Sequence, residues 1–268
     1  MDDSALLGLC HAVADAVPRA LATMTDLSPR GERPGQYALD LVADDAVLGV
    51  LQGSGLAVLS EESGYSEPDG DGSGGTSGTG STRGGSTLVA VVDPVDGSTN
   101  AARGIPWYAT SICIVDDKGP RAAVVDNLPQ GLRYHAMRGG GAWRGEERLE
   151  PSACIRLDRA VVGLSGYPRR HLGWAQFRAL GAAALDLCLV AEGVLDAFCV
   201  GGRSHLAPWD YMGALLVCTE AGVQVGDLHG EDLVAIRMDA RRSVLAAATP
   251  GLYDELAAAA TAAWDQTP

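Results

Sequence analysis

Residues 88–100 constrain the fold of this chain more than any other stretch. They read Leu-Val-Ala-Val-Val-Asp-Pro-Val-Asp-Gly-Ser-Thr-Asn. An unbroken apolar, β-branched run is typical of a strand buried on both faces, and we expect this strand to stop at Asp93 and Pro94. Gly97 then allows a tight turn, and the three polar residues after it favour a helix start. The stretch therefore predicts a strand, a turn and a helix, with two carboxylates at the turn.

Asp93 and Asp96 are three residues apart across this predicted turn. Two carboxylates at such spacing are close enough to share a hard cation, and the helix start beyond them offers backbone amides to an anion. Taken alone, however, Asp-Pro followed by Asp-Gly is equally consistent with a plain turn.

Two other blocks carry acids at the ends of predicted elements. Residues 55–63 form a short apolar strand that ends in Glu61 and Glu62, and residues 208–222 open with Pro-Trp-Asp and end with Glu-Ala-Gly. Asp210 falls in the first turn of the second block, where it would also serve as a helix cap. Three separated acidic blocks together favour a site over three unrelated turns.

These three blocks resemble the inositol monophosphatase family, in the same order along the chain. Residues 60–62 resemble the family's Gly-Glu-Glu, residues 93–100 its Asp-Pro-hydrophobic-Asp-Gly-Ser/Thr-x-Asn, and residues 209–222 its Trp-Asp followed by Glu-Ala-Gly. The resemblance implies an α/β (α+β) fold, specifically a five-layered αβαβα sandwich. Residues 1–150 would form an N-terminal half with most metal ligands. Residues 151–268 would form a C-terminal half with Asp210 and the substrate-side loop.

The resemblance also implies a Mg²⁺-dependent, lithium-sensitive phosphatase that acts on a small phosphate monoester. Unaided hydrolysis of such esters is extremely slow, and two or three Mg²⁺ ions would neutralise the phosphate and activate a water. Mg²⁺ prefers oxygen ligands. The implied ligands are the carboxylates of Glu61, Asp93, Asp96 and Asp210 and the carbonyl of Val95.

The implied catalytic residues surround the same motif. Ser98, with Asp44 or Glu62, would orient and deprotonate the attacking water, and the amides of Gly97 and Ser98 would hold the phosphate. Asp44 lies in a helix predicted over residues 37–51 and is the residue that best aligns with the family's activating aspartate. A solvated acidic face is an equally good interpretation of Asp44.

Substrate choice is less constrained by the sequence. Ala183 matches the family's small residue beside the substrate, Arg203 could contact an acidic or nucleotide group, and His205 is either a substrate contact or a polar loop residue. The candidate substrates are inositol phosphate, histidinol phosphate, a sugar phosphate or a nucleoside 3'-phosphate. The alternative is a non-catalytic relative that binds phosphates.

Charge and cysteine usage narrow the function further. Twenty Lys and Arg stand against 34 Asp and Glu, and a net charge of -14 disfavours nucleic acid polymers as partners. The six cysteines are scattered and read as reduced core residues, so any metal should be oxygen-bound. Neither a leader nor an apolar stretch of ~18 residues is evident, which favours a cytoplasmic protein without a membrane partner. The family resemblance makes a homodimer the default expectation.

The remaining pattern completes the expected fold. Helices are predicted over residues 4–24, 182–193, 211–220 and 252–264, and a mainly antiparallel sheet over residues 109–143. Residues 174–180 form either a short helix or a strand. Residues 63–86 are rich in Gly and Ser and predict a flexible loop, either a mobile flap or disorder.

Overall fold

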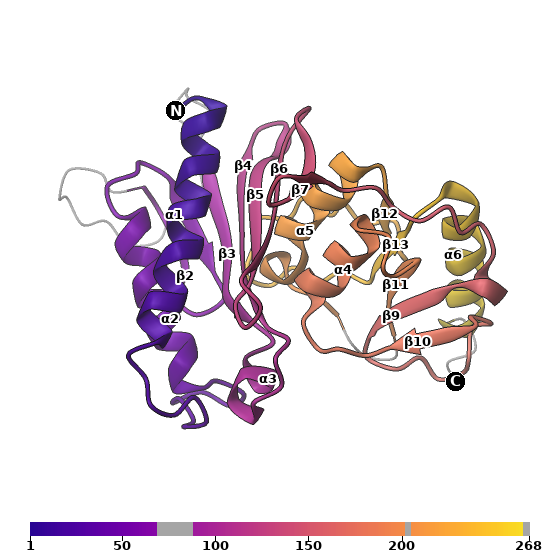
Figure 1. The fold of residues 1–268 in the computed structure, drawn as a ribbon, viewed down its shortest axis with the longest axis horizontal. Helices are drawn as coiled ribbons and strands as arrows, with labels where there is room; N and C mark the ends of the chain where they lie inside the picture. The colour runs from indigo at the N-terminus through magenta and orange to yellow at the C-terminus, as the bar shows by residue number, and fades with distance from the viewer. Residues whose placement is uncertain (69–87, 202–204, 265–268) are drawn as a thin grey trace.

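The computed structural model of the chain describes residues 1–68, 88–201 and 205–264. Five layers of secondary structure follow one another across the molecule, as Figure 1 shows. In order they are a helix pair, a large sheet, a second helix pair, a smaller sheet and a last helix. The helices of these layers are α1 (Asp3–Leu21), α2 (Ala38–Leu51), α4 (Ala183–Ala191), α5 (Pro208–Ala221) and α6 (Pro250–Trp264). The helix predicted after Gly97 is the short α3 (Ser98–Arg103). The expected αβαβα sandwich is confirmed.

The larger sheet has eight strands in the order β2-β1-β3-β4-β5-β6-β7-β8 within the described residues. Strands β1 and β3 are parallel, and every other neighbouring pair is antiparallel. The bounds are β1 (Ala57–Ser60), β2 (Gly64–Ser66), β3 (Val89–Asp96), β4 (Ala109–Asp116), β5 (Gly119–Asn127), β6 (Leu132–Met137), β7 (Gly141–Arg144) and β8 (Glu147–Arg148).

Strand β3 is buried along its whole length, as its apolar run predicts. Ala90 and Val92 belong to the core formed with α1 and α2, whereas Val89 and Val91 belong to the core formed with α4 and α5. Successive side chains of a strand point to opposite faces of the sheet. Because helices cover both faces, alternation of polar and apolar residues is not possible here.

The end of β3 differs from the predicted turn. The strand continues through Asp96, and its register against β4 shifts between Asp93, which pairs with Ser111, and Asp96, which pairs with Ala109. Pro94 has no N–H group and so cannot donate a hydrogen bond to the neighbouring strand. Its carbonyl accepts a 2.9 Å hydrogen bond from the Thr110 hydroxyl. The two carboxylates therefore project from an irregular strand end and not from a turn.

The smaller sheet has five strands in the order β10-β9-β11-β13-β12 within the described residues. Residues 176–178 form a strand that runs parallel to β9, so the strand alternative holds for this part of residues 174–180. Helix α6 packs on the outer face of this sheet. The bounds are β9 (Val161–Ser165), β10 (Gln176–Arg178), β11 (Ala197–Val200), β12 (Gln224–Asp227) and β13 (Val244–Ala247).

The structure bears in part on two predictions, the loop over residues 63–86 and the division near residue 150. The loop predicted over residues 63–86 begins with strand β2, which pairs with β1, and residues 69–87 lie outside the described residues. The division near residue 150 stays a prediction, because α5 packs against β4, β5, β6 and β7 in a core that both halves share.

All six cysteines are free, and five of them are buried.

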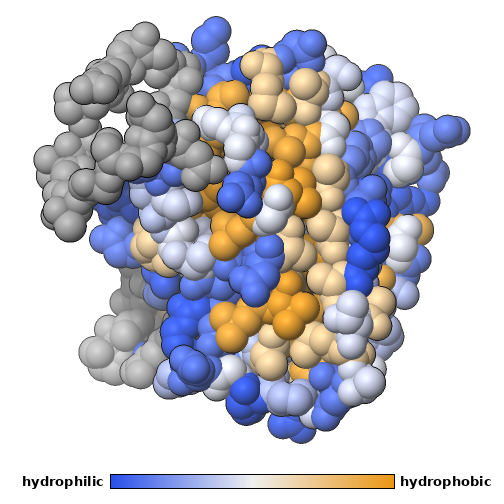
Figure 2. All heavy atoms as spheres, turned by 90° about the vertical axis from the view of Figure 1, so that its left-hand side faces the viewer, coloured by the Kyte–Doolittle hydropathy of each residue, from blue (hydrophilic) through white to orange (hydrophobic). Residues whose placement is uncertain are grey.

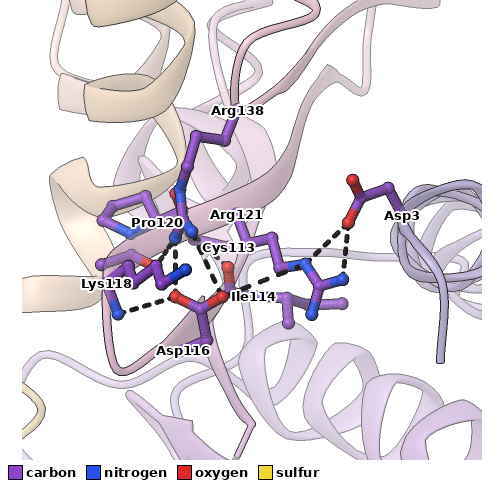
Figure 3. A network of polar contacts seen from close by, with 9 residues as sticks. Asp3, Cys113, Ile114, Asp116, Lys118, Pro120, Arg121 and Arg138 are labelled. Atoms are coloured by element: carbon purple, nitrogen blue, oxygen red, sulfur yellow. Dashed lines mark hydrogen bonds and ion pairs between the residues drawn. The ribbon is translucent and has the colours of Figure 1, made fainter.

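The surface has an apolar face over α1 and α2 and a charged cluster at the turn between β4 and β5. Apolar residues gather on the face that carries α1 and α2 (Figure 2), where Leu41 is 40% exposed. At the far end of β4, Asp116 pairs with Arg138 at 2.7 Å, and Arg121 joins this turn to Asp3 of α1 (Figure 3). Within the described chain, no helix is both long and apolar enough to cross a membrane.

Candidate active site

A cavity of about 210 Å³ lies where β3 ends between the layers. Residues from both halves of the chain line it, including every residue expected to bind metal and three of those expected to contact phosphate or substrate. Its lining includes Glu61, Asp93, Val95, Asp96, Gly97, Ser98, Ala183 and Asp210. The structure thus brings together residues that are far apart in the sequence.

The topology explains how Glu61 reaches this cavity. Strands β1 and β3 run in parallel, with Ser60 opposite Val92. The amide of Glu61 continues the ladder with a 3.2 Å hydrogen bond to the Val92 carbonyl. Because the carboxyl ends of adjacent parallel strands meet at one edge of the sheet, Glu61 emerges beside Asp93.

Backbone amides orient the other carboxylates. Oδ1 of Asp93 accepts from the Val95 amide at 3.0 Å, and Oδ2 of Asp96 accepts from the Ala184 amide at 2.7 Å, at the start of α4. Oδ2 of Asp210 accepts from the Ala207 amide at 2.8 Å. Asp210 therefore caps α5 and lines the cavity at the same time, so the two interpretations of this residue are compatible.

Burial and mutual repulsion make these carboxylates strong proton acceptors. Burial, followed by the charges of neighbouring acids, raises the pKa of Asp93 and Asp96 well above the usual range and that of Glu61 to about 8. Burial also raises the pKa of Asp210 to about 6. The carboxyl groups of Glu61 and Asp93 are hydrogen-bonded to each other. Such a cluster is stabilised by protons or by cations.

The donor set fits a hard divalent cation. The cavity offers carboxylate oxygens and the Val95 carbonyl, and among the described residues neither Cys nor His lines it. Across residues 1–68, 88–201 and 205–264, no group of three His, Cys, Asp or Glu side chains already converges as a finished metal cage. Cation binding would therefore require these carboxylates to turn toward one another.

A second cavity of about 400 Å³ adjoins the first, since Glu61 and Ser98 line both. Asp40 and Glu62 also line this second cavity. The Ser98 hydroxyl and the Asp40 carboxylate are hydrogen-bonded, which lowers the pKa of Asp40, but burial outweighs this and raises it to about 6. Ser98 therefore has a buried carboxylate beside it.

Asp44 does not line either cavity. It is buried, and its Oδ1 accepts a 2.5 Å hydrogen bond from the Ser60 hydroxyl. Asp40, one helical turn earlier on α2, is hydrogen-bonded to Ser98, the residue for which the family resemblance implied Asp44 or Glu62 as partner. Asp40 could have been noticed in the sequence as an acid in the first turn of the predicted helix. In the structure its Oδ2 accepts a 2.8 Å hydrogen bond from the Tyr37 amide.

Three further residues were expected to take part in catalysis or substrate binding, namely Glu62, His205 and Arg203. Glu62 forms an ion pair with Arg33 and accepts a hydrogen bond from Gln36. His205 contacts the Ser243 hydroxyl at 3.2 Å through Nδ1 and precedes Leu206, which lines the first cavity. Arg203 lies outside the described residues.

Gly97 and Asn100 join the two halves at the cavity. Gly97 has φ +85°, and a Cβ there would lie 3.0 Å from the Gly181 carbonyl oxygen. The Asn100 amide nitrogen donates to the carbonyls of Trp107 and Leu180, each at 2.8 Å. Position 97 therefore requires a residue without a side chain, and position 100 requires a side chain that can donate two hydrogen bonds.

Comparisons with known proteins agree with this geometry. A model of the inositol monophosphatase family matches residues 36–265. The chain is 31% identical to the fructose-1,6-bisphosphatase/inositol-1-monophosphatase of Archaeoglobus fulgidus over 96% of this chain and 98% of that protein. It is 30% identical to the protein of the same name from Methanothermobacter thermautotrophicus, over 93% and 94%.

Solved structures give the same result. The crystal structure of inositol monophosphatase-II from Staphylococcus aureus superposes with a TM-score of 0.74 at 26% identity, over 95% of this chain and 92% of that one. Fold, site and likenesses together define a phosphoric monoester hydrolase that acts on small phosphate esters. The chain belongs to the inositol monophosphatase family.

Proposed function

We propose that this chain is a Mg²⁺-dependent phosphatase that hydrolyses the phosphate monoester of a small polyol, sugar or nucleoside. The observation that carries the proposal is the meeting of Glu61, Asp93, Asp96 and Asp210 in one buried cavity beside Ser98. Asp93 and Asp96 are buried, and Glu61 and Asp210 are half-buried. Placing four such carboxylates together is unfavourable unless a ligand compensates their charge. A site for cations explains why the fold tolerates this cluster.

Two or three Mg²⁺ ions would be held by the four carboxylates and the Val95 carbonyl. When bound, they would neutralise the phosphate dianion and lower the pKa of a water. The carboxyl groups of Glu61 and Asp93 are hydrogen-bonded to each other and their pKa is raised, so cation binding would displace the proton that this pair favours.

Asp40 and Ser98 would act on the attacking water. Ser98 is hydrogen-bonded to Asp40 and would pass the proton of the water to that carboxylate, so Asp40 replaces Asp44 in our assignment. The negative charge of Glu62 raises the pKa of Asp40 and would strengthen it as a base. The new P–O bond forms as the ester P–O bond breaks, and the alkoxide takes up a proton from solvent water, so that inorganic phosphate and an alcohol leave. Asp40 then returns its proton to the solvent.

The phosphate and the alcohol would meet different parts of the cavity. The amides of Gly97 and Ser98 would hold the phosphate, and Ala183 would leave room for the alcohol. Arg203 and His205 precede Leu206, which lines the cavity, and they remain our candidates for substrate selection. Arg203→Ala should therefore change KM or substrate preference more than the rate of the chemical step.

Phosphate release from a panel of esters tests the function and names the substrate. The panel contains inositol phosphates, histidinol phosphate, sugar phosphates, fructose 1,6-bisphosphate and nucleoside 2'- and 3'-phosphates, each assayed with Mg²⁺ and with EDTA. We expect Mg²⁺-dependent release from one class. Stabilisation by Mg²⁺ without release from any ester would instead support a non-catalytic phosphate-binding protein.

The proposed assembly rests on the family resemblance, and the absence of a nucleic acid partner rests on the net charge of -14. We propose a homodimer that works in the cytoplasm without a nucleic acid or membrane partner. Light scattering of the purified chain tests the oligomeric state, since a monomer mass at micromolar concentration would contradict it.

A further inference from the structure

Asp186 lines the first cavity but has no part in the mechanism described above. It lies on α4, one helical turn after Ala183, and is 1% exposed. Residues three apart on a helix share a face, so Ala183 and Asp186 face the cavity together. Sequence patterns did not single out Asp186, because it falls within an apolar helix.

Two neutral donors fix the orientation of this carboxylate. Nε1 of Trp107 donates to Oδ1 of Asp186 at 2.8 Å, and the main-chain amide of Leu180 also donates to Asp186. Two donors do not saturate a carboxylate, which has about four lone-pair positions. Asp186 therefore retains capacity to accept a further hydrogen bond.

The negative charge of Asp186 is not needed to hold Trp107. A neutral acceptor would satisfy the indole, whereas a buried charge is costly to keep beside another carboxylate. Asp186 acts unfavourably on the charge of Asp96. The presence of the Asp186 carboxylate is explained if it binds a polar group of a molecule that enters the first cavity.

The two cavities distinguish the sides of the reaction. In phosphoryl transfer the attacking and leaving oxygens lie roughly in line on opposite sides of phosphorus. Asp40 lines only the second cavity, which is therefore the side of the water. Asp186, Leu164 and Leu206 line only the first cavity, which is therefore the side of the leaving alcohol.

We propose that Asp186 is a substrate-binding residue that accepts a hydrogen bond from a hydroxyl group of the leaving alcohol. The inference rests on the proposed phosphatase function and adds a determinant of specificity to it. A site built to hydrogen-bond a substrate hydroxyl discriminates against an analogue that lacks it. Asp186 thus selects alcohols with a second hydroxyl near the ester.

The test compares two esters of similar ring size, myo-inositol 1-phosphate and cyclohexyl phosphate, which has no hydroxyl group. Asp186→Asn removes the charge but keeps an oxygen that can accept from Trp107. We expect kcat/KM for inositol 1-phosphate to fall about 10- to 100-fold, because the carboxyl oxygen that accepts from the substrate hydroxyl is replaced by an amide NH2 group. With cyclohexyl phosphate the change should stay within about 3-fold.

Asp116→Asn is the matched control, because it removes a carboxylate that is paired with Arg138 at the far end of β4. It should leave kcat/KM for both esters unchanged. The melting temperature of each variant is measured alongside. A loss of equal factor on both esters would mean that Asp186 only supports the structure, and no loss on either would also overturn the inference.

A second measurement does not depend on the variant folding. The unmodified enzyme should prefer inositol 1-phosphate over cyclohexyl phosphate by about 10-fold or more in kcat/KM. Equal rates would contradict a hydroxyl-binding residue. If neither these esters nor the wider panel were hydrolysed at any Mg²⁺ concentration, the phosphatase function itself would fail, which is a different result.

Discussion

The carboxyl groups of the half-buried Glu61 and the buried Asp93 are hydrogen-bonded to each other. Such a pair holds a proton at a pH at which exposed carboxylic acids have lost theirs. The stability of the structure therefore depends on bound protons or cations.

The metal-free protein should lose stability as pH rises. The pKa of Glu61 is raised to about 8 and that of Asp210 to about 6, whereas an unfolded chain titrates such groups near 4. Between these values the folded state binds more protons, so the free energy of unfolding falls as pH increases. Thermal unfolding in EDTA should show a melting temperature lower at pH 8 than at pH 5, by on the order of 5 °C.

Mg²⁺ should remove most of that loss, because a bound cation replaces the protons. The check is the same melt at pH 8 with millimolar Mg²⁺. Identical melting temperatures with Mg²⁺ and with EDTA would contradict the assignment of these carboxylates as ligands.

Asp40 and Asp44 should behave differently when substituted. Asp40→Asn removes the base beside Ser98 and should lower kcat about 10²- to 10⁴-fold with little effect on the fold. Asp44→Ala leaves the buried Ser60 hydroxyl without its acceptor and should cost about 1–3 kcal/mol of stability. Its kcat should stay within about 3-fold of the parent.

Steady-state kinetics and denaturant unfolding of both variants separate these two roles. The reverse outcome, with the larger loss of turnover in Asp44→Ala, would restore the assignment made from sequence.

Gly97 should not tolerate a side chain. Gly97→Ala would place a Cβ 3.0 Å from the Gly181 carbonyl oxygen and 3.1 Å from the Ala182 Cβ, at φ +85°. Gly104→Ala is the control, because its φ is +72° but a Cβ there meets nothing within 4 Å. Gly104→Ala should cost about 1–2 kcal/mol for the left-handed backbone alone.

Gly97→Ala should cost more than this and should also reduce activity, since the displaced backbone lines the cavity. Urea unfolding and phosphate release measure the two effects. Equal costs for both glycines would show that the contact between the halves is not tight.

Local sequence patterns predicted most of the fold but could not resolve the site completely. The apolar run of β3 required a strand with both faces covered, and the periodicity of α2 required a helix. Periodicity cannot decide whether Asp40 or Asp44 faces Ser98, because that depends on how α2 packs against a strand end far along the chain. The bulge at Asp93 likewise depends on pairing with β4.

Asp186 shows the same limit. Its neighbours predict a buried helix, and its donor Trp107 is 79 residues away. A carboxylate in such a helix becomes visible as a site residue only when the two halves are packed together.

The most direct test of the account is phosphate release by metal-stripped enzyme as Mg²⁺ is added back, with Asp93→Asn beside it. We predict that activity on the preferred ester of the panel rises from background to saturation with Mg²⁺. Asp93→Asn should remain lower by about 10³-fold or more at every Mg²⁺ concentration, because the buried charge at the centre of the ligand set is lost. Full activity in the stripped enzyme, or in Asp93→Asn, would contradict a catalytic cation site at these carboxylates.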